Sequence, residues 1–374
     1  MGGPLAIVGF LALILLVVIP IHELGHLLLA RRFGFKIQEY FVGFGPRLWS
    51  VRRGETEYGV KAIPAGGYVK IAGMNPYEPV APEDLPRAYG SKPIRQRALV
   101  ILAGPLSHLL VGAVLYLALF VTYGDPNTDR VIVGDVSKSL GGEVSPASQA
   151  GLQPGDVVIR VGDLEDPSPD SLGTYVTRQA MDRPGEPLTY VIDRDGRRLV
   201  LPIVPQLVKE VGVTRGRIGF TLGPERLSLP EAAVVSGQWV GRAGWNSVAM
   251  IPKIFTEGVG RTASVLFSDE RRQPDDPVSL VGVSRQIGDA GAQGDWALFL
   301  GFAAYVTIFI GVVNLVPLPP LDGGHLLVLA WEKITGRQAD YRKLVPVSAA
   351  VIIFFSIFAI ATVFLDITEP LPRI

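Results

Sequence analysis

The sequence predicts a polytopic α-helical membrane protein with four transmembrane helices, a small β-hairpin region on the cytoplasmic side and an extracytoplasmic α+β domain. Hydrophobic residues make up 48% of the 374 residues and charged residues only 19%, below the quarter that is usual in soluble domains. The apolar residues gather in four blocks, each long enough to cross about 30 Å of hydrocarbon. These blocks are residues 5–30, 98–121, 296–317 and 345–365.

The charge balance and the lack of cysteine restrict the classes of site. The chain has 35 basic and 35 acidic residues, so its net charge gives no indication of a nucleic-acid partner. It contains no Cys, which excludes disulfides and thiolate metal ligands. Any zinc site must therefore use histidine and carboxylate ligands.

The first block, residues 5–30, is predicted to be a transmembrane helix although its place at the N-terminus suggests a signal peptide. The four residues from Met1 to Pro4 contain no basic side chain, and no small-residue cleavage site follows the block. A signal peptide normally has a basic N-terminal region and a small-residue cleavage site. We therefore expect this block to stay in the membrane.

The loop charges predict the orientation of the chain. The 31–97 loop has 12 Lys/Arg against 6 Asp/Glu, and the 331–344 loop has 4 against 2, whereas residues 124–295 have 18 against 23. Basic loops stay on the cytoplasmic side. We therefore expect both termini and residues 124–295 outside the cytoplasm, with His22 near the cytoplasmic end of the first helix.

The 31–97 loop contains two β-favouring stretches, residues 35–51 and 58–71, which predict small antiparallel hairpins. The turns from Gly43 to Pro46 and from Pro64 to Gly67 are expected to break these strands. A strand with a free edge beside an active site can bind an extended substrate by strand addition, and a sheet that only packs is the alternative. The candidate substrate-binding residues of this region are Gly43, Phe44, Gly45, Gly67 and Tyr68.

Residues 124–206 form a predicted domain between the two halves of the membrane core, 1–123 and 296–374. The run from Ser145 to Asp163 indicates a short helix, a Gly/Pro turn and a buried strand, and a hairpin follows around Asp195-Gly196. The Ser-Pro-Ala, Ala-Gly-Leu and Gly-Asp-Val-Val sequences in this run closely resemble those of PDZ domains. The resemblance implies a domain that binds a freed C-terminus or another extended peptide; a rigid spacer is the alternative.

Residues 207–295 are predicted to be a connector between this domain and the third block. Residues 229–267 have the apolar spacing of an amphipathic helix. We expect this helix to lie at the interface on the outer face of the membrane.

The end of the first block contains His22-Glu-Leu-Gly-His26. Two imidazoles four residues apart lie on one face of a helix, a spacing that one tetrahedral zinc ion accepts. Glu23 can take a proton from a water held by such an ion. A hydrogen-bonded polar pair at a helix end is the alternative, but ionisable groups at membrane depth are costly and usually functional.

A catalytic zinc has three protein ligands, and the strongest candidate for the third is Asp322. It lies in Asn314-Leu-Val-Pro-Leu-Pro-Pro-Leu-Asp-Gly-Gly-His325, whose prolines break regular helix. Broken helix is tolerated at membrane depth only against protein or a wet cavity. The alternatives are that Asp322 caps a helix or pairs with His325, or that His325 is itself the third ligand.

These motifs together resemble the site-2 protease family of intramembrane zinc metalloproteases, particularly its bacterial members with one PDZ domain that regulate sigma factors. The resemblance also includes Gly43-Phe-Gly-Pro46, Gly66-Gly67-Tyr-Val-Lys, Ala103-Gly-Pro105 and the segment that begins at Asn314. It implies a Zn²⁺ ion held by His22, His26 and Asp322, Glu23 as general base, and Asn314 as a substrate-binding residue. It also implies a multi-pass protein of the bacterial inner membrane that cleaves single-pass membrane proteins, such as anti-sigma factors or remnant signal peptides.

One position departs from the family pattern. The second core helix of the family usually continues Ala-Gly-Pro with an Asn three residues on, and His108 stands there in this chain. A neutral imidazole can donate one hydrogen bond to a developing oxyanion. His108 is therefore a candidate catalytic residue, and metal binding or plain packing are the alternatives.

Two other functions compete with the protease. A membrane scaffold with a PDZ domain and no catalysis would not need Glu23, both histidines and Asp322, all of which are present. A transporter or zinc channel predicts paired polar residues along the helices, whereas the ionisable residues cluster at one depth near His22, Asp322 and His325.

Overall fold

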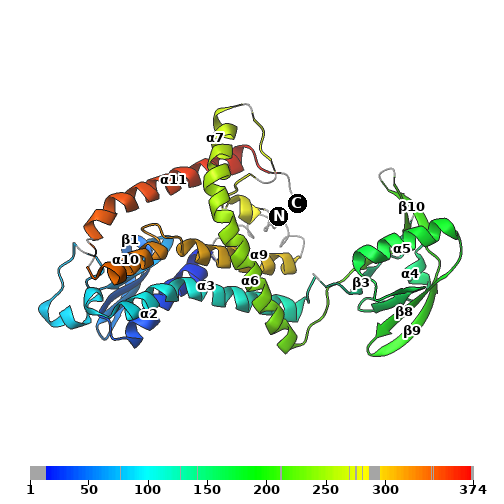
Figure 1. The fold of residues 1–374 in the computed structure, drawn as a ribbon, viewed down its shortest axis with the longest axis horizontal. Coiled ribbons are helices and arrows are strands. Elements are labelled where there is room, and N and C mark those ends of the chain that lie inside the picture. The colour runs from blue at the N-terminus through cyan, green and yellow to red at the C-terminus, as the bar shows by residue number, and fades with distance from the viewer. Residues whose placement is uncertain are drawn as a thin grey trace. The chain divides into compact units, whose positions relative to one another are not determined.

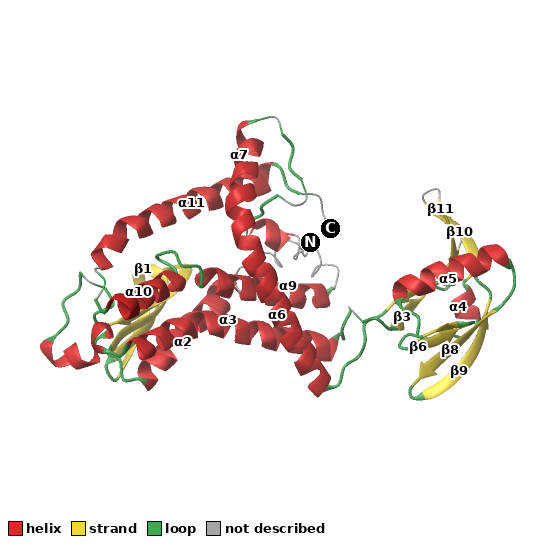
Figure 2. Ribbon diagram, viewed as in Figure 1, coloured by secondary structure: helices red, strands yellow, loops and turns green. Residues whose placement is uncertain are grey.

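A computed structural model describes residues 14–371, except 76, 127, 141, 211–212, 269, 274–275, 280, 286–294, 338 and 340. The chain folds into two compact units (Figure 1), one built from Met1–Leu119 and Val234–Ile374 and the other from Phe120–Ala233. In the first unit helices lie beside one long β-hairpin, whereas the second unit combines sheets with helices (Figure 2).

The helices of the first unit come from both ends of the chain. They are α2 (Ile19–Arg32), α3 (Ile94–Thr122), α6 (Leu229–Lys253, in this unit from Val234 onward), α7 (Val259–Phe267), α9 (Trp296–Asn314), α10 (Asp322–Thr335) and α11 (Val345–Thr368). A π-helical turn precedes α2 at Ile14–Val18, and another at Ile254–Gly258 joins α6 to α7. Short 3-10 turns cover Pro82–Arg87, Tyr89–Ser91 and Tyr341–Leu344.

Three of the described helical stretches are long and apolar enough to cross a membrane: Ile94–Thr122, Trp296–Asn314 and Arg342–Thr368. They coincide with three of the four predicted blocks. The first predicted block, 5–30, falls partly outside the described residues, of which 14–32 are helical. A fourth span therefore remains a prediction.

Small residues allow α3 and α9 to approach each other closely. A Cβ atom added to Gly112 of α3 would lie 2.7 Å from Ile308 Cδ1 on α9, and one added to Gly311 of α9 would lie 2.6 Å from His108 Cβ on α3. Close packing of this kind is how helices associate in a lipid environment, where apolar burial alone does not drive them together.

The predicted cytoplasmic-side hairpins form one long hairpin of β1 (Ile37–Arg53) and β2 (Thr56–Ile71). The Gly-Phe-Gly-Pro sequence does not end its strand as predicted, because Gly43 and Gly45 take φ values of +90° and +80° inside β1. They are sites of register shift, an irregularity that a strand tolerates when glycine supplies the positive φ. The base of the hairpin packs on α2 and α3 in an apolar cluster that includes Leu27, Phe35, Ile37, Ile71, Tyr89 and Val100.

The second unit contains a sheet with the strand order β12-β3-β6-β8-β9, and β7 pairs with β6. Its strands are β3 (Val131–Val136), β6 (Val157–Val161), β7 (Leu164–Glu165), β8 (Leu188–Arg194), β9 (Arg197–Ile203) and β12 (Phe220–Leu222). Two small hairpins, β4 (Ser139–Leu140) with β5 (Glu143–Val144) and β10 (Gln206–Glu210) with β11 (Val213–Arg217), complete its strands. The helices are α4 (Pro146–Gln149) and α5 (Pro169–Asp182), each of which begins at a serine that caps it.

The structure extends this unit beyond the predicted end at residue 206. Strand β12 pairs with β3 through Phe220↔Val136 and Leu222↔Val133, so part of the predicted connector belongs to the sheet. The Gly-Asp-Val-Val sequence has a structural reason, because the buried Asp156 accepts hydrogen bonds from Arg194 and from the backbone of Gln153. The assignment of this unit as a PDZ domain stays a prediction from its sequence.

The predicted amphipathic helix over 229–267 corresponds to α6 and α7 with the π-helical turn between them. Its side chains contact three helices of the first unit in succession. Trp239 packs on Tyr116 of α3 with ring centroids 5.6 Å apart, and Phe255 stacks on Phe354 of α11 at 6.0 Å. Between them, the Tyr305 hydroxyl of α9 donates to Met250 Sδ. Its position relative to a bilayer remains a prediction.

Candidate metal centre and active site

The paired histidines of α2 point the same way, as their spacing requires. His22 and His26 are each 8% exposed, and their rings meet edge to face with centroids 4.7 Å apart. The two Nε2 atoms lie 3.1 Å from each other. Arg31 and Arg32 occupy the last turn of α2, where positive charge is favourable to the helix dipole.

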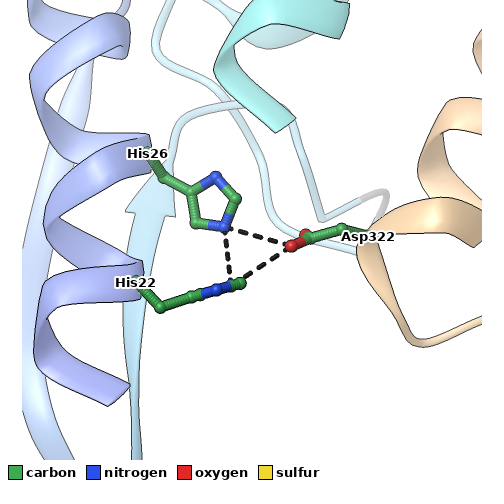
Figure 3. A group of neighbouring side chains, drawn as sticks. All are labelled: His22, His26 and Asp322. Atoms are coloured by element: carbon green, nitrogen blue, oxygen red, sulfur yellow. Dashed lines mark hydrogen bonds and ion pairs between the residues drawn. The ribbon is translucent and has the colours of Figure 1, made fainter. Parts of the chain in front are cut away.

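Asp322 is the first residue of α10 and lies opposite this pair (Figure 3). Its Oδ2 atom is 3.1 Å from His22 Nε2 and 3.4 Å from His26 Nε2. The two glycines that follow explain how α10 begins here: a Cβ added to Gly323 would overlap the Leu315 carbonyl oxygen, and one added to Gly324 would lie 2.6 Å from Pro319 N. The proline-broken segment therefore folds directly against the first turn of α10.

Helix α3 orients His26 from behind. Its Nδ1 atom lies 2.8 Å from the Val100 carbonyl oxygen, which accepts a hydrogen bond from the Nδ1–H group. The Nε2 lone pair is therefore free to bind a metal. A Cβ added to Gly104 would overlap His26 Nε2 and lie 2.8 Å from His22 Cε1. The glycine of the Ala-Gly-Pro sequence is thus required for α3 to pass behind both imidazoles.

The three donor atoms fit a zinc ion. Their separations are 3.1, 3.1 and 3.4 Å, and ligand atoms bonded tetrahedrally at 2.0–2.1 Å would lie about 3.3 Å apart. Among the residues that the structure describes, these three form the group of His, Asp or Glu side chains that could hold a metal. Asp322 Oδ2 is in contact with both Nε2 atoms, and His22 Nδ1 is buried without a hydrogen-bond partner within the described chain.

Glu23 lies between the histidines and the hairpin. A Cβ added to Gly67 of β2 would lie 3.2 Å from Glu23 Cγ, and Val69 of the same strand lines the cavity together with Glu23. The carboxylate and the three donor residues open on a cavity of about 340 Å³. Its other lining residues are Tyr68, Val69, Ile71, Met74, Val100, Ile101, Asn314, Pro320 and Leu321.

The predicted substrate-binding residues divide into two groups. Tyr68 and Asn314 line the cavity, and Gly67 lies against Glu23. Gly43, Phe44 and Gly45 do not line it, but the Phe44 ring stacks on Tyr68 with centroids 6.2 Å apart. This part of β1 therefore supports the cavity wall rather than forming it.

His108 and His325 lie near the donor group without joining it. His108 is 1% exposed, its ring centroid is 5.0 Å from that of His22, and it is not among the residues that line the cavity. Neither of its ring nitrogens has a hydrogen-bond partner within the described part of the chain. The structure therefore places His108 behind His22, and His325 is not among the three grouped residues.

Sequence reasoning missed the apolar side of the site. Ile71, Met74, Val100 and Ile101 line the cavity, and the carbonyl of Val100 orients His26. No sequence signal identifies these residues, because each is of a common apolar type within an apolar or β-favouring run.

The chain is similar to known proteases over nearly its whole length. Residues 10–359 match the model of a family described as Peptidase family M50. "Zinc metalloprotease Rip1" of Mycobacterium tuberculosis (strain H37Rv) is 32% identical, with 96% of each chain covered. Its namesake in Mycolicibacterium smegmatis is 34% identical, with 96% of this chain and 97% of the relative covered.

A third relative matches a somewhat smaller share of the chain. "Putative zinc metalloprotease all3971" of Nostoc sp. is 32% identical over 88% of this chain and 87% of its own length. The family match includes the two histidines of α2, the Ala-Gly-Pro sequence of α3 and the Asp-Gly-Gly sequence of α10. The chain belongs to peptidase family M50.

Proposed function

We propose that this protein is an intramembrane zinc metallopeptidase that cleaves single-pass membrane proteins within or near their transmembrane segment. In this proposal His22, His26 and Asp322 hold the zinc ion, and Glu23 is the general base. The observation that carries it is the convergence of two imidazoles and one carboxylate, 3.1–3.4 Å apart, beside a cavity of about 340 Å³. Membership of a peptidase family and relatives named zinc metalloproteases support it.

Different residues of the chain have different roles in the proposed hydrolysis. Bound zinc supplies Lewis-acid polarisation of the scissile carbonyl and of water. Glu23 takes a proton from the attacking water and returns it to the leaving amine. Gly67 of β2 lies against the Glu23 side chain, and the Val100 carbonyl holds His26.

The hairpin supplies a surface for an extended substrate. In the described part of the chain β1 and β2 form a sheet of two strands, and Gly67 to Val69 of β2 run beside Glu23. A substrate helix must unwind before cleavage because its carbonyls are shielded by internal hydrogen bonds. We propose that the unwound segment adds to β2 as a strand and passes Tyr68 and Asn314.

The location and the substrates follow from charge distribution and family. We propose a multi-pass protein of the bacterial inner membrane, with the termini and the Phe120–Ala233 unit outside and the site near the cytoplasmic side. Anti-sigma factors or remnant signal peptides are the proposed substrates. The Phe120–Ala233 unit, as a PDZ domain, would bind a freed C-terminus or exclude substrates that still carry a large outer domain.

The experiment that tests the proposal combines zinc analysis with cleavage of a model transmembrane segment by the purified full-length protein. We expect Asp322→Ala to lose zinc and cleavage together, and Glu23→Gln to keep zinc while cleavage falls by about 10²–10⁴-fold. Cleavage by Glu23→Gln at the wild-type rate would contradict the assigned base. A phenotype in cells that survives Glu23→Gln would favour the scaffold function instead.

A further inference from the structure

We infer that the buried ion pair between Arg97 of α3 and Glu332 of α10 positions Asp322 against the histidines of α2. Arg97 and Glu332 are thus positioning residues that lie outside the cavity, and they act through the helix that Asp322 begins. The inference rests on the proposed function, since it assumes that Asp322 binds zinc.

The ion pair is enclosed by protein and held at both ends. Arg97 Nη1 lies 2.8 Å from Glu332 Oε2, and the two side chains are only 6% and 4% exposed. The Arg97 Nε atom donates to the Lys92 carbonyl, and its guanidinium group lies 5.6 Å from the centre of the Tyr89 ring. Glu332 Oε1 accepts from the Ala339 backbone amide. Neither charged group can move without breaking several contacts.

Stability alone gives a weak reason for such a pair. Taking two charges out of water costs about as much as their attraction returns, and well-packed apolar residues of similar volume often serve as well. A charged side chain in a membrane helix is costly, and such residues usually pair with one another and mark functional positions. Arg97 lies in the first turn of Ile94–Thr122, a helix with the length and composition of a membrane span.

One turn of α3 contacts both helices that carry the donor residues, α2 and α10. The Val100 carbonyl, three residues after Arg97, accepts the hydrogen bond from His26. The same turn therefore fixes His26 through its backbone and α10 through Arg97. Asp322 is ten residues before Glu332, which places the two about 15 Å apart along the axis of α10.

The ion pair supplies a directional restraint in addition to the apolar packing of α10. The first turn of α10 packs through Gly323 and Gly324 against the preceding segment. Its outward side chains make little contact, because Leu327, Trp331 and Ile334 are 54%, 59% and 84% exposed. The inner face of α10 is packed, since Val328 and Leu329 are 7% and 2% exposed and Leu326 packs against the cluster of α2, α3 and the hairpin. Apolar contacts are non-directional, so the ion pair adds a directional restraint on rotation of α10 about its axis.

A small rotation would be enough to disturb the metal centre. An atom about 5 Å from a helix axis moves by about 2 Å when the helix turns by about 20°. Metal–ligand distances tolerate only about 0.2 Å. The restraint at Glu332 thus bears directly on whether Asp322 Oδ2 stays within reach of both imidazoles.

The test measures zinc affinity of the full-length protein in detergent by competition with a chelator, together with the visible absorption of the Co²⁺-substituted protein. The variants are Glu332→Gln and the charge exchange Arg97→Glu with Glu332→Arg. The matched control is Asp366→Asn, which breaks the equally buried pair between Asp366 of α11 and Arg272. That pair has no contact with α10 among the interactions described for either residue.

We expect Glu332→Gln to weaken zinc binding by about 10–100-fold, the range typical of residues that orient metal ligands, and to change the Co²⁺ spectrum. The charge exchange should recover part of this loss. Asp366→Asn should lower the thermal unfolding temperature and leave zinc affinity unchanged.

Three results would overturn the inference. They are wild-type zinc affinity in Glu332→Gln, equal loss of zinc in Glu332→Gln and Asp366→Asn, or an unaltered Co²⁺ spectrum with weaker binding. If Glu332→Gln does not fold, Glu332→Asp keeps the charge on a side chain one methylene shorter, and undiminished zinc affinity in it has the same meaning. Failure of the wild-type protein to bind zinc would refute the proposed function as well, whereas zinc binding insensitive to Glu332 refutes this inference alone.

Discussion

Replacing Gly104 by alanine tests whether α3 must pass directly behind the two imidazoles. The added methyl group would overlap His26 Nε2 and lie 2.8 Å from His22 Cε1. Ordinary contacts between carbon atoms are about 3.5–4.0 Å, so the methyl group is at least about 0.7 Å too close to the second ring. The obstruction comes from two buried rings and not from the end of a flexible side chain.

Two responses are open to the protein, and both disturb the donor group. If α2 and α3 separate, the packing at this crossing is lost, and overpacking of this kind typically costs about 1–3 kcal/mol. If His26 rotates instead, its 2.8 Å hydrogen bond to the Val100 carbonyl breaks. Loss of such an orienting bond weakens metal binding by about 10–100-fold. We therefore expect weaker zinc binding in either case.

The assay is zinc affinity by chelator competition on Gly104→Ala and on a control variant, Gly241→Ala. Gly241 also lies in a helix, α6, but a Cβ added there meets no atom within 4 Å. Alanine is the better helix former by up to about 1 kcal/mol, so Gly241→Ala should be neutral or slightly stabilising. Wild-type zinc affinity in Gly104→Ala would refute the geometry that we describe behind the histidines.

Three further predictions concern the cavity, the hairpin turn and the metal. Met74→Trp should fill part of the cavity of about 340 Å³ and raise KM for a model transmembrane substrate more than it lowers kcat, with zinc content unchanged; an unaltered KM would show that substrate does not enter beside Met74. Glu55 lies in the turn between β1 and β2. Hydrogen bonds from Arg87 and, to a lesser extent, from Lys36 lower its pKa to about 2. Because this folded-state pKa is below the ordinary value of 4.5, the stabilisation is present above pH 4.5 and is lost as the pH falls toward 2. The thermal unfolding temperature of the wild type should therefore fall more steeply over that range than that of Glu55→Gln, and parallel curves would contradict the prediction. Removal of zinc by a chelator should lower the unfolding temperature, since free zinc at 100 times its Kd stabilises the folded state by about 2.7 kcal/mol; Asp322→Ala should show no such response to the chelator.

The donor residues of the site could be proposed from the sequence because each carries a local signal. His22 and His26 are four residues apart in a helix, and this spacing alone brings their Nε2 atoms to one side. Asp322 is a carboxylate that directly follows a segment that three prolines prevent from being helical, at a depth where an unpartnered charge is costly. Chemical necessity therefore linked residues that are 300 positions apart, and the structure places their atoms 3.1–3.4 Å from one another.

Other features depend on contacts that no local pattern shows. Gly43 and Gly45 were expected to end a strand, yet β1 continues through them, because β2 supplies a partner on both sides of the irregularity. Phe220–Leu222 looked like irregular connector and instead pairs with β3. In both cases pairing with another strand outweighed the local preference for a turn.

The sequence by itself determined the membrane character of the chain, the helix with the paired imidazoles and the chemical types of the donor group. These follow from hydropathy, helical period and the cost of buried charge, all of which act within short stretches of chain. Only the tertiary structure decided that His108 lies behind His22 and outside the cavity, that Val100 orients His26, and that Arg97 meets Glu332. Those relations arise where helices cross, and the position of a crossing depends on packing among distant residues rather than on the order of residues in any one helix.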